Sequence, residues 1–239
     1  MVVHTRAIVI SAIKYSEAHL IASCYTETSG IKSYMLRDIL KSKKGALRPS
    51  HFQPLTLLQI VARHKNKGTL EYIKEAKVFR QYKTVHTNIH KSSIVFFLSE
   101  ILKSALREEE PNKPMFQFLI ETCYWLDENG PLGNFPNLFL LKLTQHLGFY
   151  PSTQKRSLPY FNLLEGRFQE NGYGAHIEKG QAVEGLKQLF GINFDTLHKI
   201  KQPKNKRLAV LHLLLAYYAI HLHGFKKPNS LPVLHQLFN

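Results

Sequence analysis

Hydrophobic and polar positions alternate with a period of two through much of the first 85 residues of the chain. Such alternation is typical of β-strands that bury one face. It predicts short strands at residues 5–13, 20–25, 31–36, 55–61 and 68–78. Gly30 marks one turn, and Asn66 with Gly68 supplies the residues that a tight hairpin requires. Five short strands with a longer loop between the third and fourth predict a small closed barrel. The OB-fold is the small barrel that most often carries single-stranded nucleic acid, although the strand count also fits an SH3-like barrel.

From about residue 90, hydrophobic residues recur every three or four positions, which predicts helices. Ser92 or Ser93 is a suitable N-cap for the first helix, Pro111 stops it, and Asn112 precedes the second. Further helices are predicted at residues 136–147, 181–190, 206–222 and 231–238. The predicted fold class is therefore α+β. A five-stranded OB-fold barrel at residues 1–85 is followed by an all-helical domain at residues 86–239.

The sequence carries no signal for a membrane or an oxidising compartment. Its longest hydrophobic run, residues 208–222, is shorter than the ~20 residues that span a bilayer. The chain does not open with a basic stretch and a long hydrophobic run, as a signal peptide would. Cys24 and Cys123 lie 99 residues apart and suggest no disulfide framework. We expect a reduced, cytoplasmic protein without membrane contact.

The charge is strongly positive and unevenly placed. The formal net charge is +15, and residues 1–85 hold fifteen Lys and Arg against five Asp and Glu. With a pI near 9.8, this local excess is the electrostatic pattern of a nucleic-acid-binding protein. A single amphipathic basic helix, which would indicate a membrane surface, is not visible.

The most basic segment runs from residue 37 to residue 54 and contains Ser42, Gly45, Pro49 and Ser50, so it is predicted to be a loop. Cations this close repel one another unless an anion covers them, although a merely solvated basic loop is the alternative. With the next hairpin, the loop supplies the candidate DNA-binding residues Arg37, Lys41, Lys43, Lys44, Arg48, Lys65 and Lys67. Three nearby aromatic residues either stack on bases or belong to the core: Tyr34, Phe52 and Tyr72.

No catalytic site or cofactor is predicted. The chain has no H-E-x-x-H and no C-x-x-C motif, and two histidines two positions apart on a helix, His221 and His223, point to different faces. The glycines of residues 171–174 lack the strand and the Lys-Ser/Thr end of a phosphate-binding loop. The acidic residues of the barrel form no cluster for divalent metals. A non-enzymatic role is therefore expected.

Several segments together resemble one protein family. They are TRAIVISAIKYSEAHLIASCYTETSGIKSYMLRDI and FQPLTLLQIVARHKNKGTLEYIKE in the barrel, then EEEPN, LFLLKLTQHLGFYP and YYAIHLHGFKKPNSLPVLHQLF. Their order and spacing over essentially the whole chain resemble RecO, the bacterial recombination mediator, and particularly its variants from Bacteroidetes-like bacteria. The resemblance implies an OB domain followed by a helical domain.

The resemblance also implies a function in DNA repair and recombination. Proteins of this family bind single- and double-stranded DNA, anneal complementary strands, and work with RecR to load RecA onto DNA coated by single-strand binding protein, so we expect a nucleoid-associated protein. The basic loop of the family matches Lys41, Lys43, Lys44 and Arg48 here, with Arg37 at the strand end. An RNA- or translation-associated OB protein would use the same basic face and is the alternative.

The chain departs from the family in one respect. Many RecO proteins carry a zinc module of two C-x-x-C motifs after the segment that matches LGFYP. Here no cysteine occurs between residues 150 and 191. We therefore expect a metal-free insert around residues 150–180.

A second cationic group lies at the two ends of the longest predicted helix. In the resembled family the helical domain receives the acidic C-terminal tail of single-strand binding protein. The hydrophobic stripe of this helix (Leu211, Leu214, Leu215 and Tyr218) is expected in the core, with an edge that forms a groove for such a peptide. The candidate partner-binding residues are Lys204, Lys206, Arg207, Lys226 and Lys227.

Overall fold

The computed structural model describes residues 1–41, 47–65, 70–107, 110–130 and 132–237. The chain divides into two compact units, Met1–Glu128 and Asn129–Asn239. In the described residues, no helix is long and apolar enough to cross a membrane.

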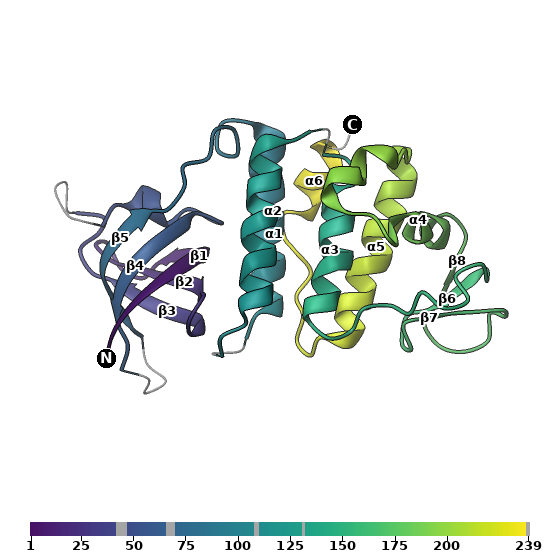
Figure 1. The fold of residues 1–239 in the computed structure, drawn as a ribbon, viewed down its shortest axis with the longest axis horizontal. Coiled ribbons are helices and arrows are strands. Elements are labelled where there is room, and N and C mark those ends of the chain that lie inside the picture. The colour runs from purple at the N-terminus through teal and green to yellow at the C-terminus, as the bar shows by residue number, and fades with distance from the viewer. Residues whose placement is uncertain (42–46, 66–69, 108–109, 131, 238–239) are drawn as a thin grey trace. The chain divides into compact units, whose positions relative to one another are not determined.

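The N-terminal unit begins with the predicted barrel (Figure 1). Its strands are β1 (Val2–Lys14), β2 (Leu20–Thr26), β3 (Gly30–Leu36), β4 (Leu57–Arg63) and β5 (Tyr72–Val78). All neighbours in the order β3-β2-β1-β4-β5 are antiparallel. A parallel bridge between Tyr34 and Glu71 brings the two ends of the sheet together. This closure confirms the predicted OB-type barrel.

Alternation along the strands separates an inner from an outer face. Val9, Cys24 and Tyr34 point inward, and the barrel core also contains Leu36, Ile39, Phe52, Leu58, Ile60 and Ile73. A bulge in β1 between Val9 and Ser11 shifts the register by one residue. A bulge of this kind bends the strand and increases its twist, which helps a short sheet to close.

Two helices complete the N-terminal unit, α1 (Ile89–Ala105) and α2 (Lys113–Glu128). The predicted N-cap at Ser92 or Ser93 is wrong: Asn88 caps α1, and its side chain accepts hydrogen bonds from the N–H groups of His90 and Lys91. The serines lie inside the first turns, where their hydroxyls donate to backbone carbonyls one turn earlier. Asn112 accepts from the N–H of Met115 at the start of α2, as expected.

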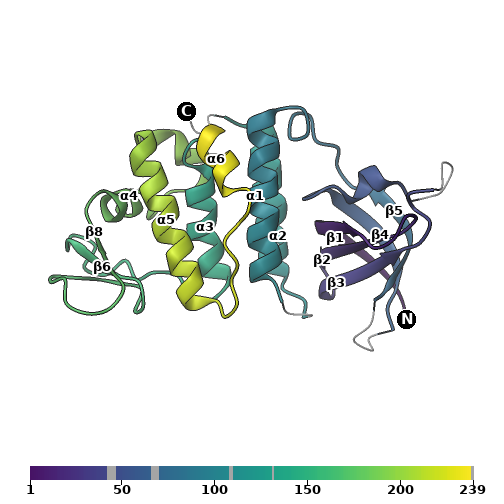
Figure 2. The same cartoon turned by 180° about the vertical axis from the view of Figure 1, so that it is seen from behind.

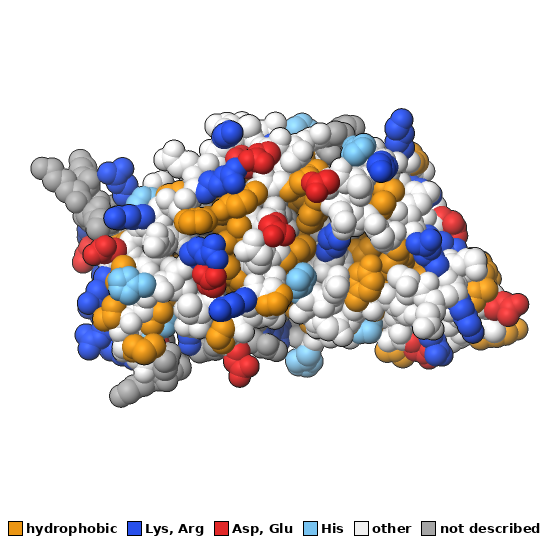
Figure 3. Space-filling view, in the orientation of Figure 1, with side chains coloured by type: hydrophobic (Ala, Val, Ile, Leu, Met, Phe, Trp, Pro, Cys, Tyr) orange, Lys and Arg blue, Asp and Glu red, His pale blue; other side chains and the backbone are white. Residues whose placement is uncertain are grey.

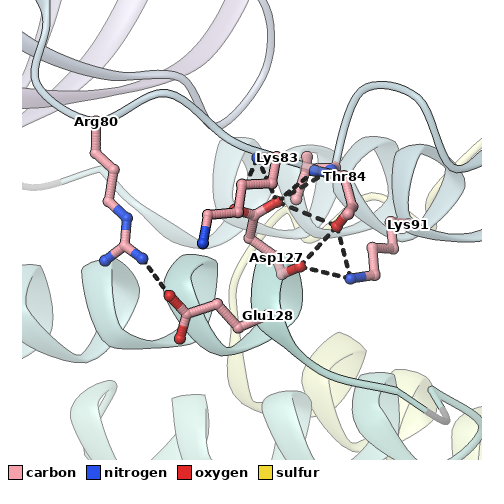
Figure 4. A network of polar contacts seen from close by, with 7 residues as sticks. Arg80, Lys83, Thr84, Lys91, Asp127 and Glu128 are labelled. Atoms are coloured by element: carbon pink, nitrogen blue, oxygen red, sulfur yellow. Dashed lines mark hydrogen bonds and ion pairs between the residues drawn. The ribbon is translucent and has the colours of Figure 1, made fainter.

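The connection from β5 to α1 is held by one buried carboxylate, that of Asp127 on α2 (Figure 4). It accepts hydrogen bonds from the backbone N–H groups of Lys83, Thr84 and Val85 at 2.8–3.2 Å. The ammonium group of Lys91 donates to Thr84 Oγ1 and to the backbone carbonyl of Asp127, both at 2.7 Å. Burial alone would raise the pKa of Asp127, but the hydrogen bonds from the connection outweigh it and hold that pKa below its usual value.

The C-terminal unit contains α3 (Phe135–His146), α4 (Gln181–Leu189), α5 (Lys204–His221) and α6 (Leu231–Leu237), and Figure 2 shows α3 beside α5. The helical prediction is confirmed with one addition. Three strands, β6 (Tyr160–Asn162), β7 (Arg167–Gln169) and β8 (Ile177–Lys179), form a small antiparallel sheet in the insert. The second domain is therefore not all-helical. The sequence did not predict these strands, because three residues are too few for an alternating pattern to be recognised.

We predict that replacing Asp127 destabilises the N-terminal unit. Asp127→Ala removes the acceptor of three backbone N–H groups, two of them partly buried and that of Val85 buried, and should lower the free energy of unfolding by about 3 kcal/mol. Asp127→Asn should cost about half as much, because the amide retains one acceptor oxygen but turns a donor toward the N–H of Lys83. Urea unfolding of full-length variants measures both effects.

The same experiment has a pH dependence. Because the folded pKa of Asp127 is below its unfolded value, its contribution should be complete above about pH 4 and be lost as the pH falls through the folded pKa. Glu128→Gln is the matched control, since Glu128 only pairs with Arg80 at the surface, and should change stability by less than about 1 kcal/mol. Equal stability of the Asp127→Ala and Glu128→Gln variants would contradict this account of the connection.

Candidate nucleic-acid interface

The edge where β3 meets β5 positions the first part of the candidate surface. The N–H of Met35 donates to the carbonyl of Glu71, and the N–H of Glu71 donates to the carbonyl of Ser33, both at 2.8 Å. Tyr34 and Glu71 are buried on the inner side of this bridge. Since side chains alternate along a strand, the next residues, Met35 and Tyr72, lie on the outer side.

Two of the predicted cations meet at Tyr72. The guanidinium of Arg37 donates to the Tyr72 hydroxyl at 3.1 Å, and its central carbon lies 5.1 Å from the ring centroid. The ammonium group of Lys65 lies 5.4 Å from the same centroid. Lys65 is held at its backbone, where its N–H donates to the buried carboxylate of Glu71 at 2.7 Å. Residues that are far apart in the sequence thus form one cationic group around a half-buried aromatic ring.

The other predicted loop cations are only partly described. Lys41 is exposed after a turn in which its N–H donates to the carbonyl of Asp38. Arg48 is exposed at the start of the short 3-10 helix Pro49–Phe52. Three of the predicted residues lie outside the described part of the chain: Lys43, Lys44 and Lys67.

The sequence prediction missed four exposed cations of the described barrel strands, namely Lys14, Arg63, Lys74 and Lys77. Arg63 lies directly opposite Tyr72 in the β4–β5 register. On the face shown in Figure 3, several Lys and Arg side chains lie over the barrel. The alternation that predicted the strands could have identified Arg63. It lies two residues after Val61 in β4, so both side chains point to the same, outer face of the sheet.

Two of the three candidate stacking residues are core residues. Tyr34 is 0% and Phe52 is 2% exposed, so neither can stack on a ligand. The Tyr34 hydroxyl lies 2.9 Å from Nε2 of His64, which is also buried. Burial raises the pKa of Tyr34 and lowers that of His64, so this pair stays neutral at neutral pH. Tyr72 is the remaining candidate.

In the C-terminal unit, two of the five candidate partner-binding residues converge. Lys204 and Lys227 both act on the pKa of His235 on α6, whose ring lies 5.1 Å from that of His212 on α5. Burial, and after it the neighbouring positive charges, lower the pKa values of His212 and His235. These histidines were not predicted as site residues. The spacing of hydrophobic residues predicts each helix separately, but it does not show that the chain bends to bring α6 against α5.

The remaining residues of this prediction have other surroundings. Lys226 is exposed. Arg207 donates to the carbonyl of Gln202 at 2.7 Å and packs against Gly133, beside a cavity of about 490 Å³. Lys206 packs near Gly185 of α4. The stripe of α5, Leu211, Leu214, Leu215 and Tyr218, is 0–4% exposed and belongs to the core.

Aromatic packing holds the insert. Phe161 of β6 lies 5.0 Å from Phe168 and 5.9 Å from Tyr217 of α5, measured between ring centroids. The His221 ring stacks on Phe149, and His221 Nε2 lies 2.8 Å from the carbonyl oxygen of Leu163. Among the described residues, no group of three or more His, Cys, Asp or Glu side chains could hold a metal ion. Both cysteines of the chain are buried, and burial raises their pKa values to about 12, so neither is a thiolate at neutral pH.

Fold and surface together define an OB-fold protein with a basic barrel face, joined to a helical region. Comparison with known families agrees. A model described as "Recombination protein O N terminal" matches residues 1–82, and one described as "Recombination protein O C terminal" matches residues 86–231. The boundary between these models lies near the predicted junction at residue 85, whereas the compact units divide after Glu128.

Individual relatives show the same relationship. The chain is 46% identical over 238 residues to the DNA repair protein RecO of Christiangramia forsetii, and 42% identical over 239 residues to that of Flavobacterium johnsoniae. It is 33% identical over 244 residues to that of Bacteroides fragilis, and 100% of each of these chains is covered. The chain therefore belongs to the RecO family of DNA repair proteins. This membership gives it a role in DNA repair and recombination, in a family of mediators that are not classical enzymes.

We predict that the purified protein contains no stoichiometric zinc. Residues 150–191 offer no thiolate ligand, and the aromatic contacts of the insert need no metal. Elemental analysis should find much less than one zinc per chain, and EDTA should leave the melting temperature unchanged. One zinc per chain, with a lower melting temperature in EDTA, would contradict this prediction.

Proposed function

We propose that this chain is a recombination mediator that binds single- and double-stranded DNA through its barrel and anneals complementary strands. With RecR it would help to load RecA onto DNA coated by single-strand binding protein, at the nucleoid in the cytoplasm. The observation that carries this proposal is the group of Arg37, Arg63 and Lys65 around Tyr72. Phosphates are the ligands that such exposed cations bind best, and they are common to single and double strands.

The helical part has its own proposed role. Lys204 and Lys227 are both close enough to His235 to lower its pKa, and with His235 and His212 they form a cationic group suited to a carboxylate. The acidic C-terminal tail of single-strand binding protein has this chemistry. We propose that it binds here, which leaves the barrel available for DNA.

We predict that DNA binding depends strongly on salt and on three exposed cations of the barrel, Arg37, Lys41 and Lys65. If about five cations contact phosphates, the log–log salt slope on duplex DNA should be roughly −4. The variant Arg37→Glu, Lys41→Glu, Lys65→Glu should weaken binding by about 3 kcal/mol or more and reduce the slope to about −2. All three residues are exposed, so the variant should fold.

Fluorescence anisotropy with a labelled oligonucleotide measures both quantities. The matched control, Lys103→Glu, Lys179→Glu, Lys199→Glu, changes the charge equally at exposed positions elsewhere and should bind much as the unchanged protein does. Equal affinity of the two folded variants would move the DNA site away from the barrel. Competition with RNA of the same sequence tests the alternative function: stronger competition by RNA than by DNA would favour an RNA-associated protein.

We also predict that the tail peptide binds the cationic group of the C-terminal unit. The double variant Lys204→Ala, Lys227→Ala should weaken binding of a labelled tail peptide about tenfold or more, as loss of two charge-assisted contacts implies. Burial first, and the neighbouring positive charges after it, lower the pKa values of His212 and His235, so binding should strengthen only as the pH falls through these lowered pKa values, where imidazolium forms and attracts carboxylate.

Lys206→Ala is the matched control on the same helix, since Lys206 packs toward α4. Its affinity for the peptide should change little. Peptide binding that is independent of Lys204, Lys227 and pH would remove the site from this surface.

A further inference from the structure

A cavity of about 770 Å³ lies in the C-terminal unit, between the loop of residues 152–158 and the helix α4. Its lining residues are Thr153, Arg156 and Ser157 from the loop and Glu184 and Lys187 from α4. Sites for small ligands typically have volumes of roughly 300–1,000 Å³, so the cavity is large enough for a small molecule. All five lining side chains are polar, and a ligand that suits them is therefore polar or charged.

Backbone hydrogen bonds hold the loop side of the cavity. The N–H of Ser152 donates to the carbonyl of Gly166, in the turn between β6 and β7, at 2.7 Å. The N–H of Leu158 donates to the carbonyl of Lys155 at 3.0 Å, and this turn has two of the lining residues at its centre. The loop is thus fixed to the small sheet and presents its side chains from a closed turn.

On the helix side, two contacts position the ammonium group of Lys187. It donates to Glu184 Oε1 at 2.7 Å and lies 5.7 Å from the ring centroid of Phe168, which is itself buried. The Lys187 side chain is only 14% exposed as a result. An ammonium group has three donor hydrogens, so the contact with Glu184 leaves donors for a ligand. This cation is therefore already ordered at the cavity before a ligand arrives.

The donors around the cavity fit a phosphate group. Arg156 and Lys187 bring positive charges, while Thr153 and Ser157 bring hydroxyl groups. Phosphate oxygens point in several directions and can accept from donors on two elements at once, whereas the two oxygens of a carboxylate lie in one plane. Charge-assisted hydrogen bonds from Arg and Lys, together with hydroxyl donors, are common contacts of phosphate groups in proteins.

The charge balance of the cavity favours a small ligand over a nucleic-acid strand. Glu184 lines the same wall and offsets one of the two positive charges. A strand carries a row of phosphates and is matched by a groove of cations along its path. The nearest strand of the small sheet offers no such continuation, because Arg167 of β7 pairs with Glu165. The lining therefore suits a single phosphate-bearing molecule.

We propose that this cavity binds the phosphate group of a small molecule, either inorganic phosphate or a nucleotide. Arg156 and Lys187 bind the phosphate oxygens, and the hydroxyls of Thr153 and Ser157 orient the group. The bound phosphate connects the loop to α4. The site is independent of the DNA binding proposed for the barrel.

Isothermal titration calorimetry of the full-length protein tests the site with two probes, inorganic phosphate and ADP, at one ionic strength. The unchanged protein should bind at least one probe saturably. The variant Arg156→Gln, Lys187→Gln should weaken that binding about tenfold or more, because two charge-assisted contacts are lost. The matched control Arg167→Gln, Lys179→Gln removes the same charge from exposed positions of the insert outside the cavity, and should bind the probe as the unchanged protein does.

The two probes also distinguish the sources of the phosphate. Tighter binding of ADP would identify a nucleotide as the ligand, and equal binding would show that the phosphate group alone is recognised; both results support the site. Absence of saturable binding for both probes, or equal affinity of the cavity variant and the control, would overturn it.

A labelled oligonucleotide separates this site from the proposed function. The cavity variant should keep the DNA affinity of the unchanged protein. A loss of DNA affinity in the cavity variant, but not in the control, would assign these cations to the path of DNA and overturn the small-molecule site.

Discussion

The N-terminal unit depends on the buried carboxylate of Asp127. The chain leaves the barrel after β5 and must turn into α1, so the N–H groups of residues 83–85 lie outside any strand or helix and are wholly or partly shielded from water. Buried N–H groups need acceptors, and Asp127 supplies oxygens to all three from the last turn of α2. Lys91 adds a cation from α1 to the same network. One side chain thus joins the connection to both helices.

This junction decides which part of the barrel can meet a ligand. With the helices held against the barrel, Phe116 packs on Tyr25, and the guanidinium of Arg6 lies 5.5 Å from the Phe116 ring centroid while it pairs with Glu27. The covered area ends near the bulge of β1, beyond which Ile13 and Tyr15 are exposed. The exposed half of the outer face adjoins the cations around Tyr72. The exposed hydrophobic residues and the cations around Tyr72 are therefore adjacent, because the helices cover another part of the outer face.

Local pattern predicted the barrel and most helices well, since the alternation of the strands and the periods of the helices are short-range signals. Asp127 was not foreseen, because its partners lie 42–44 residues earlier in the chain. The aromatic residues show the same limit. Tyr34 and Tyr72 both lie in alternating runs, but only the parallel bridge reveals that one points inward and the other outward. The pairing of His212 with His235 likewise requires the tertiary fold.

The central claim is that DNA contacts the half of the barrel face that the helices leave exposed. Hydrogen–deuterium exchange of the full-length chain, with and without a single-stranded oligonucleotide, tests it most directly. The account predicts slower exchange in residues 11–22, 33–41 and 63–78, and unchanged exchange in the small sheet of residues 160–179. Protection of the small sheet without protection of the barrel segments would contradict it.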